Sequence, residues 1–98
     1  SFAPIIGILP VSDDAEALRH INDSAFGLTA SVWTQNEKAF MEISAGIEAG
    51  TVFMNRCDYL DPRLPWSGIK GSGRGCSLSQ LAYQQLTRPQ SIHIKRLV

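Results

Sequence analysis

The pattern of apolar and polar positions predicts strands and helices that alternate along the first half of the chain. Residues 5–9 have the sequence IIGIL, an apolar run typical of a strand that is buried on both faces. Residues 29–34 alternate between two faces and residues 51–54 form another short apolar run, so both segments predict strands. Between these strands, apolar side chains recur at helical spacing within residues 15–21 and 40–47.

Capping residues indicate where the helices begin. Each predicted helix follows a Ser, Thr or Asp that has Glu or Gln three positions later, which is the spacing of a capping box. The three pairs are Asp13 with Glu16, Thr34 with Glu37 and Ser77 with Gln80. Gly50 predicts the end of the second helix. The third helix is expected over residues 77–86, because Pro89 follows it closely.

The order strand, helix, strand, helix, strand predicts parallel strands joined by right-handed crossovers. We therefore expect an α/β fold: a small three-layer parallel sheet, then a long loop at residues 55–76, a helix and a last strand. That last strand, residues 91–98, alternates apolar and polar side chains. It is expected at a sheet edge, where it can pair with another chain. Loops as long as residues 55–76 are usually functional or disordered, and the prolines and aromatic residues here favour an ordered one.

Four glycines within residues 68–75 mark backbone that turns sharply or lies against something else. One interpretation is an anion-binding loop at a helix N-terminus, and the other is a tight loop packed against another part of the protein. A phosphate loop needs its lysine after the last glycine, whereas Lys70 precedes three of the four. The dinucleotide motif needs its glycines directly after a strand. Both mismatches disfavour a small nucleotide-binding domain that would use residues 71–75.

Composition and charge exclude several classes of function. The chain has 98 residues, 44% of them hydrophobic, which is sufficient for one small domain with a core. Nine basic and nine acidic residues cancel, so neither nucleic acid nor a membrane surface is an expected partner. No apolar run is long enough to span a bilayer, and no secretory signal is recognisable, so a cytoplasmic protein is expected. Cys57 and Cys76 match no zinc pattern; they form a disulfide or, as we expect in the cytoplasm, stay reduced.

Four blocks of the sequence resemble motifs of the aldehyde dehydrogenase superfamily. PWSGIKGSGRG at residues 65–75 resembles P-[FW]-x-G-x-K-x-S-G-x-G, and NDSAFGLTASV at residues 22–32 resembles N-x-x-x-[YF]-G-L-x-A-x-V. GTVFMN at residues 50–55 resembles G-x-V-[WF]-[VIM]-N, and SFAP at residues 1–4 resembles the end of E-x-F-G-P. The spacing between the blocks also fits. The resemblance therefore covers essentially all of the chain and implies the last part of a longer catalytic domain.

The resemblance implies NAD- or NADP-dependent oxidation of an aldehyde to a carboxylic acid in the full-length enzyme. In the family a cysteine thiolate attacks the aldehyde carbon, and no residue here matches the motif that carries it. We therefore interpret Cys57 as a loop residue and expect no catalytic residue, no bound metal or cofactor and no turnover in this chain alone. His20 and His93 are expected to be ordinary surface residues, because no partner is positioned for either.

Four residues are candidates for binding. By resemblance, Phe2 matches the aromatic residue that packs beside the nicotinamide, and Trp66 and Leu60 match positions that line the aldehyde pocket. Asn55 ends the third predicted strand, and open α/β sheets place their sites at the carboxyl ends of strands. Trp66 has the alternative role of an aromatic anchor that fixes the loop, and Asn55 that of a turn-capping residue.

The resemblance also implies a division of the chain and a partner. Residues 1–90 would form part of the catalytic domain, and residues 91–98 would be the strand that joins subunits into a homo-oligomer, a dimer or a tetramer. An aldehyde would be the small-molecule partner of the full enzyme. The alternative is a stand-alone, non-catalytic module that folds and oligomerises through residues 91–98.

Overall fold

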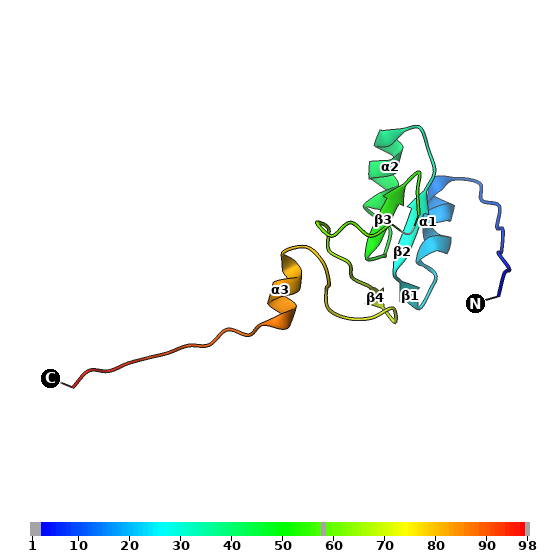
Figure 1. Ribbon diagram of the computed structural model, residues 1–98. Coiled ribbons are helices and arrows are strands. Elements are labelled where there is room, and N and C mark those ends of the chain that lie inside the picture. The colour runs from blue at the N-terminus through cyan, green and yellow to red at the C-terminus, as the bar shows by residue number, and fades with distance from the viewer. Residues whose placement is uncertain (1–2, 58, 98) are drawn as a thin grey trace.

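Residues 3–57 and 59–97 are described by the computed structural model, which contains helices and short strands (Figure 1). In chain order the elements are α1 (Asp14–Asn22), β1 (Phe26–Gly27), β2 (Thr29–Val32), α2 (Glu37–Ser44), β3 (Thr51–Met54), β4 (Ile69–Lys70) and α3 (Leu81–Leu86). The first two helices and all four strands lie together in one body, and the chain after α3 runs away from it as an extended tail (Figure 1).

The strands form two pairs. β2 and β3 are parallel, with Thr29 opposite Thr51 and Val32 opposite Met54, which confirms the predicted parallel pairing and the α/β class. β1 and β4 are antiparallel, with Phe26 opposite Lys70. The sequence-based prediction missed this second pair, because two-residue strands are too short to show a period. Through it the glycine-containing loop returns to the body more than 40 positions after β1.

Two predicted strands were wrong. Residues 5–9 and 91–97 contain no strand, and Ile6 and Ile8 are 86% and 89% exposed. A strand forms only where a neighbour shares its backbone hydrogen bonds, and no described segment pairs with either stretch. The apolar run was recognised correctly, but the surface that would cover it is absent from the described residues.

Local side-chain contacts explain where α1 and α2 begin. Asp13 Oδ1 accepts a hydrogen bond of 2.7 Å from the Glu16 backbone N–H, which confirms Asp13 as the N-cap of α1. The predicted cap Thr34 is wrong for α2, because Asn36 takes that place and accepts a hydrogen bond of 3.1 Å from the Ala39 N–H. The Thr34 hydroxyl oxygen instead accepts a hydrogen bond of 3.1 Å from the Asn36 N–H, so it binds the capping residue itself.

The third helix begins four residues later than predicted. Ser77 pairs through its backbone with Trp66, so it cannot enter a helix. Leu78 and Ser79 follow with φ of 62° and 55°, in the left-handed region that a right-handed helix excludes. α3 therefore begins at Leu81 without a side-chain cap.

The core of the described residues is small. Ile47, just after α2, and Phe53 of β3 are its buried hydrophobic residues, at 8% and 9% exposure. Leu18 of α1 packs against Gly46, where a Cβ would lie 2.6 Å from the leucine side chain. The radius of gyration is 19.5 Å, against roughly 13 Å for a compact domain of this length. The extended ends account for the difference.

Candidate functional site

A pocket of about 150 Å³ lies where β3 and the loop after it meet Trp66. Its wall is formed largely by aromatic and aliphatic side chains of Phe53, Tyr59, Leu64, Trp66 and Leu78. Phe53 comes from the strand, Tyr59, Leu64 and Trp66 come from the long loop, and Leu78 follows that loop. The described residues of the loop thus form most of the wall.

The charged groups of this pocket are each occupied by a neighbour. The Arg56 guanidinium lies 3.9 Å from the centre of the Tyr59 ring, in a cation–π contact. Arg63 donates to both carboxylate oxygens of Asp61, at 3.1 Å and 2.8 Å, and its backbone N–H donates to the same group at 2.9 Å. These hydrogen bonds from Arg63 lower the pKa of Asp61 to about 2, so this carboxylate does not act as a base at neutral pH.

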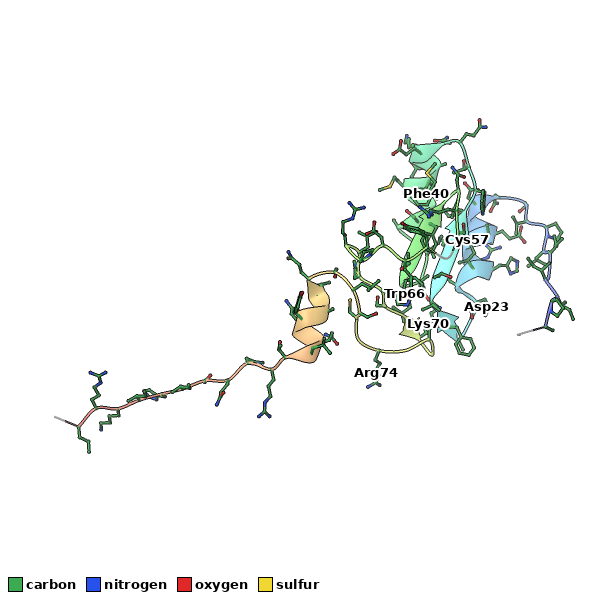
Figure 2. The ribbon with its side chains drawn as sticks, viewed as in Figure 1. Asp23, Phe40, Cys57, Trp66, Lys70 and Arg74 are labelled. Atoms are coloured by element: carbon green, nitrogen blue, oxygen red, sulfur yellow. The ribbon has the colours of Figure 1, made fainter. Side chains whose placement is uncertain are left out.

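Backbone pairing fixes the position of Trp66. Its N–H donates to the Ser77 carbonyl at 2.7 Å, and the Ser77 N–H donates to the Trp66 carbonyl at 2.9 Å. The two bonds close the loop of residues 66–77 at its base. In Figure 2 Trp66 lies near Lys70, while Arg74, farther along this loop, points away from the body. Trp66 is half-buried, which is consistent with a side chain that lines a pocket and also anchors a loop.

The other predicted site residues lie elsewhere. Leu60 is 55% exposed and does not line the pocket, and Phe2 lies outside the described residues. Asn55 has a φ of 54°, and its amide accepts from the Thr34 N–H and donates to the Thr34 C=O, both at 2.8 Å. The Asn55 amide thus joins the carboxyl ends of β2 and β3. Of the three candidates that the structure describes, Trp66 lines the pocket, and Asn55 and Leu60 do not.

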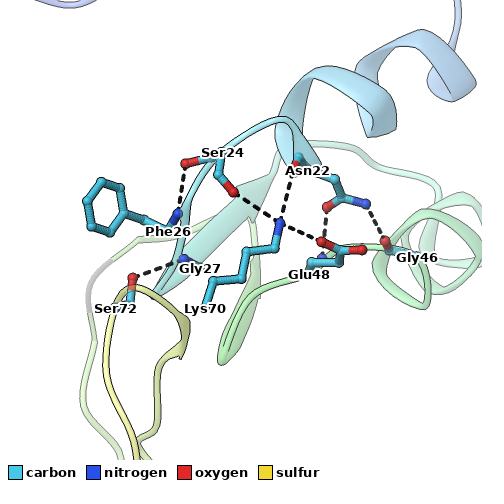
Figure 3. A network of polar contacts seen from close by, with 8 residues as sticks. All are labelled: Asn22, Ser24, Phe26, Gly27, Gly46, Glu48, Lys70 and Ser72. Carbon is cyan, nitrogen blue, oxygen red and sulfur yellow. Dashed lines mark hydrogen bonds and ion pairs between the residues drawn. The ribbon is translucent and has the colours of Figure 1, made fainter.

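A polar network that the sequence did not single out joins the loop to the body (Figure 3). The Lys70 ammonium group contacts the Asn22 carbonyl at 2.9 Å, the Ser24 carbonyl at 3.2 Å and a Glu48 carboxylate oxygen at 2.5 Å. The Asn22 amide in turn donates to the Gly46 carbonyl at 2.8 Å and accepts from the Glu48 N–H at 2.9 Å. Asn22 and Lys70 each occupy a position that one of the quoted motifs restricts to a single residue type. That restriction was the feature of the sequence that could have pointed to this network.

The glycine-containing loop packs against the body, as the second of its two interpretations proposes. The Gly71 N–H donates to the Ala25 carbonyl at 2.8 Å, and the Ser72 hydroxyl accepts from the Gly27 N–H at 2.9 Å. Gly50 lies so close to the Ser67 backbone that any Cβ there would collide with it. The Ser72 N–H also donates, to the Ile69 carbonyl at 3.0 Å, so the N–H groups of Gly71 and Ser72 are both occupied.

Residues 3–57 and 59–97 offer little further reactive chemistry. Cys57 and Cys76 are free thiols, and Cys57 is exposed. No three His, Cys, Asp or Glu residues in these ranges gather in a way that could hold a metal ion. The helices of these ranges are all too short or too polar to cross a membrane. The residues that line the pocket are mostly apolar and include no cysteine.

Comparison with known proteins gives consistent matches. The sequence model of the aldehyde dehydrogenase family matches residues 1–92. A phenylacetaldehyde dehydrogenase of Pseudomonas fluorescens is 39% identical over 93 residues, or 95% of this chain and 18% of that protein. A probable NADP⁺-dependent succinate-semialdehyde dehydrogenase of Synechocystis is 38% identical over 93 residues, or 95% of this chain and 20% of that protein.

Solved structures match in the same way. The aldehyde dehydrogenase of Bacillus cereus in complex with NAD⁺ is 36% identical, with a TM-score of 0.78 over 83% of this chain and 16% of that one. The Mycobacterium tuberculosis aldehyde dehydrogenase complexed with NAD⁺ is 33% identical, with a TM-score of 0.83 over 89% of this chain and 18% of that one. The chain therefore spans about a fifth of the length of the relatives that it matches.

Proposed function

Because the chain belongs to the aldehyde dehydrogenase family, we propose that it is the C-terminal part of a catalytic domain that oxidises an aldehyde to a carboxylic acid. The observation that carries the proposal is the pocket at Trp66, together with a family match that covers residues 1–92. Since the chain spans about a fifth of its relatives, this activity would belong to a whole enzyme. The chain alone is expected to be inactive.

The chain would contribute to the side of the site that holds the aldehyde. Trp66 would line the pocket with its ring, and Leu60, exposed here, would face the aldehyde once other parts of the enzyme lie over the loop. Asn55 would position the start of that loop through its two bonds to Thr34. An apolar and aromatic wall favours the hydrocarbon part of a substrate and excludes water from the reacting carbon.

The cofactor would be NAD or NADP, since relatives bind NAD⁺ in solved structures and one carries NADP⁺ in its name. The glycine-containing loop of this chain does not fit its phosphates, because the Gly71 N–H and the Ser72 N–H are bonded to Ala25 and Ile69 carbonyls. By resemblance, Phe2 would pack beside the nicotinamide ring. When bound, the cofactor supplies hydride acceptance.

Residues 91–98 would join subunits of a cytoplasmic homo-oligomer, a dimer or a tetramer. The described part of this segment is an extended tail, and its Ile92 and Ile94 are 79% and 74% exposed. Apolar side chains so exposed favour pairing with another chain. Sedimentation equilibrium of the chain with and without residues 91–98 tests this role. A monomer in both cases would contradict it.

A graft tests the catalytic proposal. Residues 1–98 replace the matching segment of the Bacillus cereus enzyme, and NAD⁺ reduction is measured with a series of aldehydes. Trp66→Ala in the graft should change the KM for aldehydes by roughly tenfold while leaving the KM for NAD⁺ within about twofold, because a pocket contact is worth one to a few kcal/mol. Trp33→Ala is the matched control, since Trp33 is 69% exposed and lines no part of this pocket. A change confined to the KM for NAD⁺ would contradict the proposal.

A further inference from the structure

We infer that Lys70 is a positioning residue, whose ammonium group holds the loop carrying Trp66 against the body and thereby sets the wall of the pocket. Three different segments meet at this group: the last residue of α1, the turn before β1, and the segment between α2 and β3 (Figure 3). The inference rests on the proposed function only in assigning the wall to an aldehyde site.

The surroundings of Lys70 differ from those of an ordinary surface lysine. Its side chain is 26% exposed and lies 2.5 Å from Glu48, whereas Lys38 is 86% exposed and lies 3.8 Å from Glu42 on the surface of α2. Asn22, whose carbonyl accepts from Lys70, ends α1, and carbonyls at a helix C-terminus attract a positive charge. Lys70 is therefore held by both a carboxylate and a helix end.

The backbone of Lys70 also indicates a special role. Its φ is 53°, a left-handed conformation that residues with a long side chain rarely adopt and that glycine adopts without strain. The conformation persists only where surrounding contacts over-determine it. Here the three contacts of the ammonium group, together with the pairing of Lys70 with Phe26, supply that restraint.

Lys70 is joined to Trp66 by a short stretch of restrained chain. Ser67 and Gly68 lie between them and press against Gly50, which is two residues beyond Glu48. The same two segments are thus joined twice, once by the Lys70–Glu48 ion pair and once by the backbone contact at Gly50. If the ammonium group is lost, the loop loses its bonds to Asn22, Ser24 and Glu48. The loop is then held through its backbone and Ser72, so Trp66 gains freedom to move.

The test uses the 98-residue chain in a Trp33→Phe background, where Trp66 is the remaining tryptophan. Lys70→Met keeps an unbranched side chain that is one atom shorter and removes its charge. We expect acrylamide quenching of Trp66 fluorescence to rise about twofold and exchange of the Gly71 amide hydrogen to become about tenfold faster, because the loop opens locally. Lys70→Arg should restore part of both effects. Lys38→Met is the matched control and should change neither.

Glu48→Gln provides a second variant at an exposed position in case Lys70→Met does not fold. It should raise quenching in the same direction, by a smaller factor. Unchanged quenching and unchanged Gly71 exchange in a folded Lys70→Met chain, or in Glu48→Gln if that is the folded one, would overturn the inference. In the grafted enzyme, a displaced Trp66 with an unchanged KM for aldehydes would contradict the aldehyde site and leave the positioning role standing.

Discussion

Two short apolar runs of this chain, residues 5–9 and 51–54, differ in structure: the second forms a paired strand and the first does not. Phe53 in the second run is 9% exposed within a parallel pair, whereas Ile8 in the first is 89% exposed and belongs to no strand. Both runs have the composition of buried strands. The second has β2 as a neighbour, and none of the described segments pairs with the first. A strand pattern therefore reports what a segment can form, and a neighbour decides whether it forms.

The body, which comprises the described residues of 13–77, differs in the same way from the two extended ends of the chain. We call these ends the arms; they comprise residues 3–12 and 88–97. The body has internal hydrogen bonds between segments far apart in the chain, and the arms are exposed throughout. Substitutions in the body should therefore change stability, and equivalent substitutions in the arms should not.

The largest effect is expected from a matched pair of glycine substitutions. Gly50→Ala places a methyl group against the Ser67 backbone and should lower the free energy of unfolding by about 3 kcal/mol, as overpacking does. Gly7→Ala meets nothing within 4 Å and should change it by less than about 0.5 kcal/mol. Urea denaturation of both variants measures the difference. Equal effects would contradict the distinction between body and arms.

A smaller effect is expected at the carboxyl ends of β2 and β3. Asn55→Ala removes two hydrogen bonds to Thr34 and leaves a residue with a Cβ at a φ of 54°, so a loss of about 2 kcal/mol is expected. Asn55→Gly loses the same bonds, but glycine adopts this φ without strain, so the loss of stability should be smaller. If thermal denaturation shows alanine and glycine to be equivalent, the backbone conformation contributes nothing.

Removing a side chain at the start of a helix should lower stability more where that side chain caps the helix than where it does not. Asp13→Ala removes a bond of 2.7 Å at the start of α1 and should cost about 1 kcal/mol. Gln80→Ala at the start of α3 removes no cap and should cost less than about 0.5 kcal/mol. Circular dichroism during urea denaturation measures both. A larger loss at Gln80 would mean that α3 depends on its first turn in a way that the structure does not show.

The smallest effect is expected at Asp61, whose pKa is lowered to about 2 by hydrogen bonds from Arg63. A lowered pKa contributes stability above the ordinary value of 3.8, and that contribution is lost as pH falls through about 2. Arg63→Gln should bring the pKa of Asp61 back toward 3.8, measured by NMR titration. A pKa that stays low in this variant would assign the shift to another group, such as Arg56.

The features of the fold that the sequence predicted correctly depend on residues close together in the chain or on the order of consecutive elements. Asp13 caps α1 as predicted, and the parallel pairing of β2 with β3 follows from the strand–helix–strand order. The start of α3 could not be predicted, because the pairing of Ser77 with Trp66 depends on the folded loop.

The residues of the candidate site also differ in whether the sequence could identify them. The resemblance implies that Trp66 and Leu60 line an aldehyde pocket, and this role stays a prediction for both. In the structure Trp66 lines a pocket, whereas Leu60 is exposed. The role of Lys70 could not be predicted, since its three partners come together only when α1, the turn after it and Glu48 have folded around the loop.

Hydrogen–deuterium exchange tests most directly whether the arms take their structure from surfaces outside the chain. It is measured on the 98-residue chain, diluted until sedimentation shows a monomer, and on the same residues grafted into the Bacillus cereus enzyme. We expect β2 and β3 amides to be protected in both. Amides of residues 6–9 and 91–97 should exchange freely in the monomer and become protected in the graft. Protected arms in the monomer, or free exchange of the arms in an active graft, would contradict this account.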